Sequence, residues 1–413
     1  MKKLSTAAVL ALSAAISNAN AAGYQLNEFS VTNLGRAFAG IGVAGDDYSA
    51  LAYNPAGMTL VKRSGMQAGL TMTEVASKIR GAGNTAGQKT DMDFMIPLPS
   101  AFGQYNVNDK LFLGAGIYVP FGLATRYKND SFVANGATGV RRSELEVIDT
   151  NLSAAYKLDN HLSLGISGIL RYIKGKLTSN LNNPLTGSRI GYSDFKVSGW
   201  AGTMNLGAMY EFNENTRIGL SYRFKSTQRT TGDHDVTYYT PLGNIFGRYD
   251  SVSDPELPAS WILSGYHKFG EKWGTTATVK YTQWHRFNVF PAKSTNTRIK
   301  NGVLDVDYRW KDAWNFALGQ DYYLDENWTL RAGLAWDQSP VPNNTYRTNR
   351  IPDTDRLWTS FGVSYATGNH QFDLGYAHLF MMHGKVWNSP EHDANAKYKS
   401  YSNMYALQYQ YKF

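Results

Sequence analysis

The chain has 413 residues, a formal net charge of +8 and no cysteine, so it can form neither a disulfide framework nor a catalytic thiol. Its basic residues are spread along the chain and form no cluster of the kind that binds nucleic acid, which argues against that class of partner. The mean hydropathy is −0.38 and no stretch approaches about 20 apolar residues, so we expect no transmembrane helix.

The first 21 residues have the pattern of a signal peptide. Lys2 and Lys3 form a charged start, Ala7–Ile16 is a short apolar core, and Ala19–Ala21 is an A-x-A cleavage site. The apolar core is too short to span a bilayer. We therefore expect residues 1–21 to be removed and the mature chain to begin at Ala22.

The next segment, residues 22–63, has no sustained apolar period of two. It contains several glycines and the Asn54-Pro55 pair, which favours a turn. It could be a disordered arm or a plug inside a wide barrel. We favour a plug because the segment carries apolar residues that need burial: Leu26, Phe29, Leu34, Phe38, Leu51, Tyr53, Met58 and Leu60.

The rest of the chain, residues 64–413, alternates apolar and polar residues in fourteen segments, and side chains that alternate with a period of two indicate β-strands. Trp328–Trp336 is the clearest, and Phe94–Val107 is weak because Pro97 and Pro99 lie inside it. The predicted strands are Ser64–Ser77, Phe94–Val107, Lys110–Thr125, Glu144–Leu158, Leu162–Leu177, Tyr192–Phe212, Thr216–Thr227, Leu257–Phe269, Trp273–His285, Asp312–Tyr323, Trp328–Trp336, Arg356–Tyr365, His370–Met382 and Lys397–Phe413.

The connectors alternate between short turns and longer polar loops, the longest being Gln228–Glu256 and Arg286–Lys311. Short turns at one end and long loops at the other are typical of outer-membrane barrels, as is a composition with 27 tyrosines, 10 tryptophans and 39 glycines. Only a closed barrel satisfies the backbone of strands in lipid. We therefore predict an all-β fold: a 14-stranded antiparallel transmembrane β-barrel with an N-terminal plug.

The C-terminal strand places this barrel in the outer membrane of a bacterium. Tyr405, Leu407, Tyr409, Tyr411 and Phe413 lie on one face of Lys397–Phe413, and the chain ends on an aromatic residue. Such a strand is expected to close the barrel and to be recognised through its last residue by the barrel assembly machinery. The expected surroundings are outer-membrane lipid and lipopolysaccharide, with a monomer as the simpler oligomeric state.

Several short motifs resemble the FadL-type long-chain fatty acid transporters of the outer membrane. The likeness begins at Ala22–Phe29, Leu34–Ala37 and Asn54–Ala56, and it is strongest at Asp337–Pro342 with Ile351–Arg356. Further matches lie between these, at Phe121–Thr125, Leu257-Pro258, Lys311–Ala313 and Asn327–Thr329. The motifs occur in the family's order over nearly the whole mature chain.

The resemblance implies passive uptake of long-chain fatty acids or similar hydrophobic compounds. It implies capture by extracellular loops, an N-terminal hatch, and lateral exit at a kinked third strand. Asn54, Pro55 and Ala56 would then belong to the hatch and gate transport, and Ala22, Gly23 and Tyr24 would lie close to the ligand. The residues alone also fit a purely structural role, in which Asn54-Pro55 forms a turn within a packed plug.

The third predicted strand, Lys110–Thr125, is rich in residues that disturb a ladder, because proline lacks a donor and glycine permits a bulge. Pro120 could simply end the strand at the rim or kink it inward, and the resemblance favours the kink. The residues expected at the lateral opening are Gly114, Gly116, Pro120, Phe121 and Gly122.

A fatty acid needs an apolar slot and, for its carboxylate, a cation. The arginine and lysine that serve the head group in the family fall near Ser179 and Val306 here, and neither of these residues is cationic. The chain therefore uses another base or prefers a neutral compound such as an aromatic hydrocarbon. The replacement candidates are Lys174, Lys176, Arg309 and Lys311, although each could be an exposed rim charge.

We predict no enzyme activity, no cofactor and no metal. Asp353, Asp355 and Arg356 fit a loop-to-strand turn better than a catalytic or metal site, and the scattered histidines, among them His378, His383 and His392, have no zinc-site spacing. An outer-membrane lipase stays open as a rival, although no G-x-S-x-G motif is present. Other rivals are an open porin and a surface adhesin or phage receptor.

Overall fold

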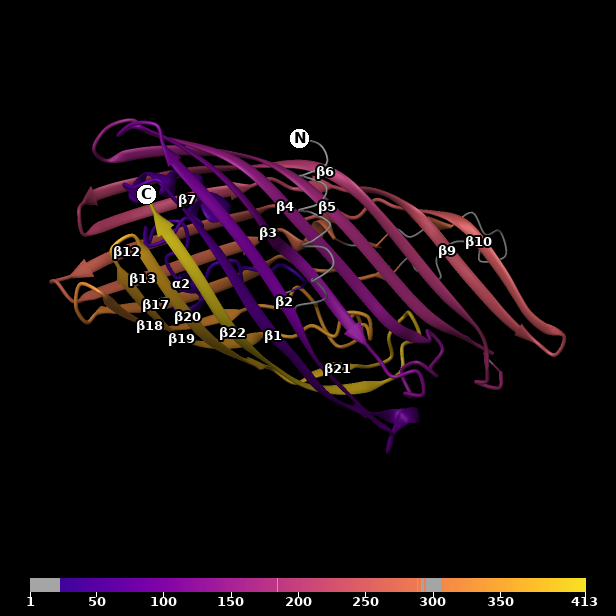
Figure 1. Cartoon of the computed structure of the whole chain (residues 1–413). Coiled ribbons are helices and arrows are strands. Elements are labelled where there is room, and N and C mark those ends of the chain that lie inside the picture. The colour runs from indigo at the N-terminus through magenta and orange to yellow at the C-terminus, as the bar shows by residue number, and fades with distance from the viewer. Residues whose placement is uncertain (1–22, 184, 288, 291–292, 295–305) are drawn as a thin grey trace.

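The computed structural model describes residues 23–183, 185–287, 289–290, 293–294 and 306–413. The predicted signal peptide and Ala22 lie outside this range. The described residues form a closed antiparallel β-barrel, in which β1 pairs with β2 on one side and with the last strand, β22, on the other (Figure 1). This confirms the predicted all-β, 14-stranded fold.

The wall consists of fourteen strands in chain order. They are β1 Gly65–Gly81, β2 Lys89–Asn106, β3 Leu111–Arg126, β4 Val140–Lys157, β5 Leu162–Asn182, β6 Arg189–Asn213, β7 Thr216–Arg223, β12 Ser260–Phe269, β13 Trp273–Thr282, β17 Ala313–Tyr323, β18 Trp328–Asp337, β19 Arg356–Thr367, β20 His370–Met381 and β22 Ala396–Lys412. Each overlaps one predicted strand. Short turns join them near the C-terminus, at the left of Figure 1.

One predicted loop proved wrong. Gln228–Glu256 is largely a hairpin of β9 (Arg229–Thr240) and β10 (Gly243–Ser253), which pairs with the first half of β6 and projects beyond the barrel opposite the C-terminus (Figure 1). Because the hairpin extends past the apolar wall, neither of its faces has to be apolar throughout. The smaller strands are β8 Ser226–Thr227, β11 Glu256–Leu257, β14 Val289–Phe290, β15 Lys293–Ser294, β16 Val306–Asp307 and β21 Gly384–Val386.

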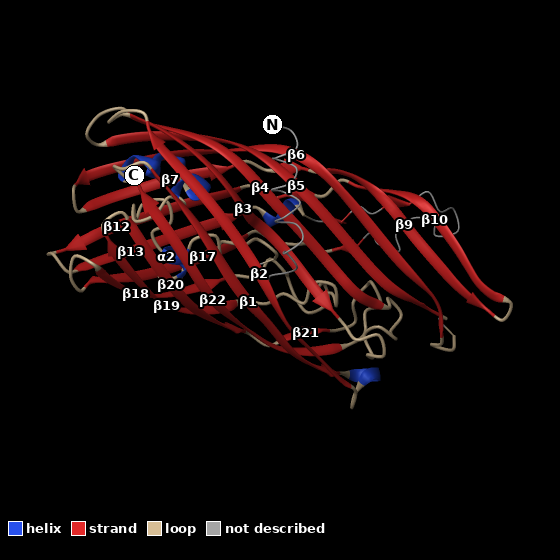
Figure 2. Ribbon diagram, in the orientation of Figure 1, coloured by secondary structure: helices blue, strands red, loops and turns tan. Residues whose placement is uncertain are grey.

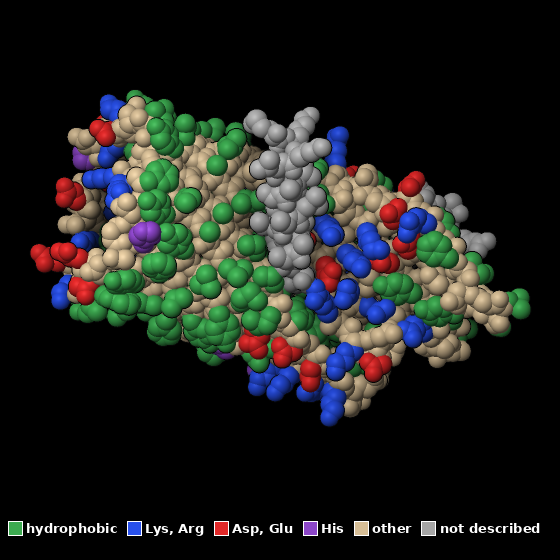
Figure 3. Space-filling view, viewed as in Figure 1, with side chains coloured by type: hydrophobic (Ala, Val, Ile, Leu, Met, Phe, Trp, Pro, Cys, Tyr) green, Lys and Arg blue, Asp and Glu red, His purple; other side chains and the backbone are tan. Residues whose placement is uncertain are grey.

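The outer face of the barrel is apolar. Outward side chains such as Leu318, Leu334 and Phe361 are 56–61% exposed, as a lipid-facing wall requires. Hydrophobic side chains cover the barrel wall, while charged side chains gather towards its two ends (Figure 3). No helix among the described residues is long and apolar enough to cross a membrane.

Residues 23–63, which we call the N-terminal segment, contact the inner faces of the strands. The segment contains α2 (Val31–Leu34), α3 (Ala50–Tyr53) and the 3-10 helix η1 (Pro55–Leu60). Almost all its residues are buried, and its helices appear among the red strands in Figure 2. The two remaining 3-10 helices, η2 (Gly83–Thr85) and η3 (Trp284–Arg286), belong to loops.

Buried ion pairs tie the N-terminal segment to the wall. Arg36 contacts Asp321 of β17 at 2.9 Å and Asp46 at 3.0 Å, and Asp46 contacts Arg331 of β18 at 2.9 Å. Burial alone would raise the pKa of Asp46, but the two guanidinium groups hold it well below its usual range. Removing one partner would leave a buried charge unpaired, so these pairs fix the position of the segment.

Glycines in the wall allow this close approach. A Cβ on Gly207 of β6 would lie 2.0 Å from Oδ1 of Asn54, and one on Gly333 of β18 would lie 2.1 Å from the carbonyl carbon of Arg36. Any larger residue would push the backbone of the segment away from the wall.

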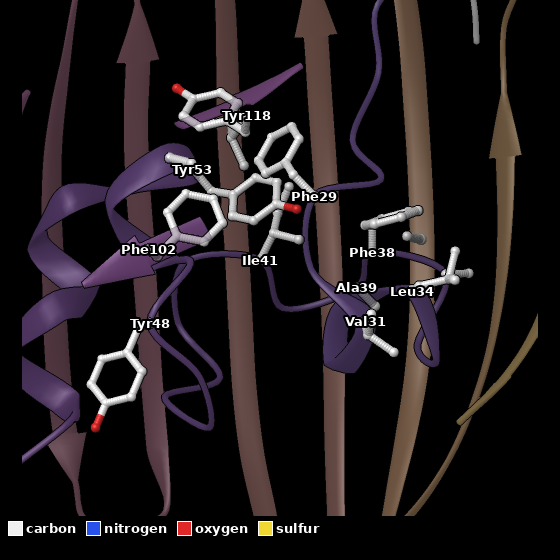
Figure 4. Close-up of a cluster of buried hydrophobic side chains, with 14 of the residues drawn as sticks. Phe29, Val31, Leu34, Phe38, Ala39, Ile41, Tyr48, Tyr53, Phe102 and Tyr118 are labelled. Atoms are coloured by element: carbon white, nitrogen blue, oxygen red, sulfur yellow. The ribbon is translucent and has the colours of Figure 1, made fainter. Parts of the chain in front are cut away.

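An apolar core joins the N-terminal segment to the wall. The rings of Phe29 and Tyr53 stack with centroids 4.5 Å apart, and Phe29 lies 4.6 Å from Tyr118 of β3. Phe102 of β2 completes this group (Figure 4). The N-terminal segment therefore packs closely against β2 and β3, where the wall is irregular.

Candidate functional site

Pairing between β2 and β3 stops partway along the barrel. The two strands pair over residues 101–106 and 112–117. Beyond this point, residues 89–100 of β2 pair with β1, and Tyr118 and residues 121–126 of β3 pair with β4, but β2 and β3 do not pair with each other. We call this unpaired stretch the seam.

The seam begins where β3 bulges. The register between β3 and β4 shifts between Tyr118 and Phe121, and Pro120 lies inside this shift. Proline cannot donate to a ladder, so a bulge is one of the few places in a sheet that accept it. The predicted disturbance of this strand is thus present, and Pro120, Phe121 and Gly122 lie together at the seam.

Gly114 and Gly116 lie elsewhere in β3. They pair with Gln104 and Phe102 in the intact part of the β2–β3 ladder. A Cβ on Gly114 would lie 2.7 Å from Cε of Met58, so this glycine makes room for the N-terminal segment and does not bend the strand.

The start of the N-terminal segment occupies the free edge of β3. The N–H of Leu26 donates to the carbonyl of Pro120 at 2.8 Å, and the N–H of Gly122 donates to the carbonyl of Tyr24 at 2.9 Å. These bonds form a short antiparallel bridge between Gln25 and Phe121. Backbone groups of β3 that have lost β2 are therefore satisfied from inside the barrel.

Apolar side chains fill the space behind the seam. Leu26 packs there among residues of four neighbouring strands. The other buried members of this cluster are Val75 of β1, Ile96 and Leu98 of β2, Val119 of β3 and Ile148 of β4.

An aromatic cluster lies next to this bridge, towards the loops. Tyr24 contacts Trp284, Phe287 and Trp310, with ring centroids 4.8, 5.1 and 5.8 Å apart. The ring of Phe121 is 6.0 Å from that of Tyr24. One residue of the N-terminal segment thus packs against both the seam strand and loops that follow β13.

Gly23 is held by the loop that precedes β19. Its N–H donates to Oδ2 of Asp353 at 3.0 Å, and Asp353 also accepts from Ser339 at 2.6 Å and pairs with Arg356. Gly23 has a φ of +64°, and a Cβ there would lie 2.7 Å from Trp284. The predicted Asp–Arg turn is therefore a polar support for the start of the segment.

A small cavity lies beside Tyr24. Its volume is about 30 Å³, roughly that of one water molecule. The lining is mainly apolar: Tyr24, Leu123, Leu145, Leu177, Phe195, Phe287, Val306, Tyr308 and Ile351, with Ser143, Glu144, Gly175, Lys176 and Arg350.

Arg350 is a buried cation in this lining, with only 6% of its surface exposed. It donates to Oγ of Ser179 at 2.8 Å and more weakly to Oγ of Ser143 at 3.4 Å. No carboxylate of the described residues lies within ion-pair distance of it. Burial lowers the pKa of Arg350, although an arginine stays protonated at any physiological pH. An anion in the cavity could therefore pair with it.

The four predicted head-group bases do not assemble into one site. Lys176 lines the cavity, 3.9 Å from Asp194, while Lys174 is exposed on the same strand. Arg309 is 63% exposed and pairs with Asp307 at 2.8 Å, and the backbone N–H of Lys311 donates to Pro340. Ser179 and Val306, the residues near which the resemblance places the head-group bases, do lie at the cavity. Ser179 accepts a hydrogen bond from Arg350, and Val306 is part of the lining.

Asn54, Pro55 and Ala56 lie together on the wall side of the N-terminal segment. Asn54 caps η1 by accepting from the N–H of Ala56 at 3.1 Å, with Pro55 at the first helical position. Its Nδ2 donates to the carbonyl of Ala208 in β6, also at 3.1 Å. The triplet therefore both turns the chain and fastens it to the wall.

The described residues contain no group of three or more His, Asp or Glu side chains that could hold a metal ion. Nδ1 of His378 donates to Oδ1 of Asn403 at 2.7 Å, and among the described residues His378 shares no metal site with His383 or His392. The buried pair of Ser193 and His234 is 2.8 Å apart, but Nδ1 of His234 has no partner in the part of the chain that is described.

The fold and this site together define an outer-membrane transport barrel: a closed 14-stranded wall, a segment packed inside it, and an apolar cavity next to a break in the wall. The family described as "Outer membrane protein transport protein (OMPP1/FadL/TodX)" matches residues 12–413, and the chain belongs to that family. It is accordingly a protein of the bacterial outer membrane.

Relatives of established name match almost end to end. The chain is 32% identical to the "Long-chain fatty acid transport protein" of Escherichia coli O6:H1, over 96% of this chain and 95% of the relative. It is 31% identical to the "Outer membrane protein P1" of Haemophilus influenzae, over 99% and 98%.

Solved structures show the same fold. A FadL homologue from Pseudomonas aeruginosa superposes with a TM-score of 0.84 at 22% identity, over 95% of this chain and 100% of that one. The toluene transporter TodX of Pseudomonas putida superposes with a TM-score of 0.71 at 19% identity, over 89% and 94%. These likenesses support the architecture of the barrel.

Sequence reasoning missed Arg350. It lies directly before Ile351–Arg356, a motif that the sequence analysis singled out, but nothing in its neighbourhood marks it as buried. Its partner Ser179 is 171 positions away, so only the folded loop brings them together.

Proposed function

We propose that the chain takes up amphipathic carboxylates, with long-chain fatty acids as the main substrate class. The observation that supports this best is Arg350, a buried cation without an ion-pair partner among the described residues, set in an apolar cavity. A carboxylate gains a charge-assisted hydrogen bond there, and its chain gains the apolar lining. Relatives named as long-chain fatty acid transport proteins agree with this substrate class.

The cavity must widen to admit such a ligand. Its volume of about 30 Å³ is far below the 300–1,000 Å³ that is typical of ligand pockets. Tyr24 is the side chain best placed to move, because it belongs to the start of the N-terminal segment and not to the wall. We propose that a ligand displaces it.

We propose that the ligand then leaves sideways through the seam. Tyr24 and Leu26 are two residues apart on one extended stretch that is bonded to Pro120 and Gly122. A ligand that displaces Tyr24 strains this bridge and draws Leu26 out of the apolar cluster behind the seam. Residues 22–63 would then act as the hatch, with Asn54, Pro55 and Ala56 as its anchor.

Aromatic hydrocarbons are the second candidate. The five rings of Tyr24, Trp284, Phe287, Tyr308 and Trp310 offer stacking surfaces to a small aromatic ligand. A solved structure with the same fold is a toluene transporter. Such a neutral ligand would make no use of the charge on Arg350, so the two candidates can be separated.

We propose no enzymatic role. The Ser193–His234 pair, which could suggest a hydrolase, is buried at 2% and 1% exposure, so an ester could not reach it. Measuring hydrolysis of a chromogenic ester by the purified barrel tests this.

We further propose that the protein is a monomer whose wall contacts outer-membrane lipid and lipopolysaccharide. Its terminal residue, Phe413, is 58% exposed, and we propose that the barrel assembly machinery recognises it.

The deciding experiment is uptake of labelled oleate and labelled toluene by a strain that lacks its own long-chain fatty acid transporter. We expect the wild-type protein to restore oleate uptake. The Asn54→Ala variant, compared at equal surface abundance, should take up less because the hatch loses its anchor to Ala208. Uptake of toluene without oleate would replace fatty acids by aromatic hydrocarbons as the substrate.

A further inference from the structure

The fourteen barrel strands, which are described throughout, contain three prolines. These are Pro97 and Pro99 in β2 and Pro120 in β3, and all three lie along the seam. The remaining prolines lie outside the barrel strands. Because proline is found in sheets mainly at free edges and bulges, this distribution points to a role in the seam itself.

The direction of each backbone N–H in β2 follows from two bonds at the end of the strand. The N–H of Val107 donates to the carbonyl of Leu111, at the start of β3, at 2.9 Å. The N–H of Asn106 donates to Oγ of Ser64, on the side of β1, also at 2.9 Å. Successive N–H groups alternate between the two edges of a strand.

This alternation holds along β2, because its register with β1 is unbroken from residue 89 to residue 104. Odd-numbered residues of β2 therefore face β3, and Pro97 and Pro99 are two of them. They are the first two such residues beyond Ala101, the last residue that pairs with β3. The ladder between β2 and β3 thus ends at Ala101, and the next two residues of β2 that face β3 have no N–H to donate.

We propose that Pro97 and Pro99 are positioning residues that keep the seam from closing into a continuous ladder. If the register of the paired part continued, Pro99 would lie opposite Val119 and Pro97 opposite Phe121. Neither proline could donate to β3 there. The inference rests on the proposed lateral exit for its functional meaning, but its structural content can be tested separately.

The prolines also remove the penalty for an open wall. An N–H group that faces lipid or apolar side chains without an acceptor is costly, and a proline has none to leave unpaired. On the other side of the seam, Pro120 likewise lacks an N–H, and Gly122 donates to Tyr24. Both edges of the seam can thus stay apart without these donors being orphaned.

The test is the double variant Pro97→Val/Pro99→Val, which returns two donors to the edge of β2. The matched control is Ala101→Val, which adds similar bulk on the same strand edge, at a position already paired with Ile117. Heat-modifiable electrophoretic mobility identifies folded barrels. Amide hydrogen exchange at positions 97 and 99 is measured by NMR in micelles, and oleate uptake is measured in cells.

We expect the two new amides to be protected as ladder amides are, and oleate uptake to fall by about fivefold or more relative to the control. Rapid exchange of both amides in a folded barrel would overturn the inference, because the seam would stay open without the prolines. Protected amides with normal uptake would uphold the role of the prolines in the seam and refute the lateral exit instead. If the double variant does not fold, Pro99→Val alone is measured in the same way.

Discussion

Replacing Arg350 with methionine tests the carboxylate site directly. Methionine has a similar length and suits the apolar lining, but it has no charge and no donor. We expect the variant to fold, because the exchange removes a buried charge and leaves no carboxylate of the described residues without its ion-pair partner. The hydroxyls of Ser143 and Ser179 would lose one partner each.

The magnitude follows from the bond that is lost. A hydrogen bond to a charged group contributes about 1.5–3 kcal/mol. Since each 1.4 kcal/mol corresponds to a factor of about ten, the dissociation constant for oleate should rise roughly 10- to 150-fold. Methyl oleate and toluene, which carry no charge, should bind the variant as well as they bind the wild type.

The assay is a titration of the purified barrel in micelles, followed by the fluorescence of the tryptophans around Tyr24. Arg309→Met is the matched control, because Arg309 is 63% exposed and pairs with Asp307 outside the cavity. Unchanged oleate affinity in Arg350→Met would refute the carboxylate site. An equal loss for oleate and methyl oleate would mean that the variant had disturbed the apolar slot and not the charge pairing.

Two further predictions concern the attachment of the N-terminal segment. Burial raises the pKa of Glu28 to about 7 from its ordinary 4.5, so the stability that its protonated form gives is full below pH 4.5 and is lost as the pH rises through about 7. Protease cleavage within the segment should therefore increase between about pH 4.5 and 7 in the wild type but not in Glu28→Gln, and a flat wild-type profile would contradict this. Gly23→Ala should destabilise the segment by about 1–3 kcal/mol, because of its positive φ and its close approach to Trp284, and a melting temperature equal to that of the wild type would count against this tight packing.

The strands could be predicted from the sequence because lipid and lumen impose a strict alternation on the residues of the wall. Leu318, Leu334 and Leu374 mark their strands without any tertiary information. The hairpin of β9 and β10 could not be predicted in this way. It extends past the apolar wall, so a segment such as Arg229–Thr240 carries no sustained apolar period and looks like a loop.

The site was predictable only where its residues disturb a strand or repeat a motif. Pro120 and Gly122 stood out as ladder breakers, and Tyr24 and Asn54 through the resemblance. Arg350 had neither signal, because its burial results from a loop that folds back against β4 and β5. The cationic candidates chosen near the expected register were close in sequence but, apart from Lys176, outside the cavity.

Pro97 and Pro99 show why strand propensity alone can mislead. They weaken the prediction of a strand over Phe94–Val107, because each proline removes a backbone hydrogen-bond donor from the ladder. Their effect depends on which neighbour loses that donor, and this follows from the bond between Val107 and Leu111 at the far end of the strand. Had the prolines stood at even-numbered positions, they would have weakened the ladder with β1, which is continuous, and the barrel would have lost closure there. At odd positions they weaken only a ladder that is already open.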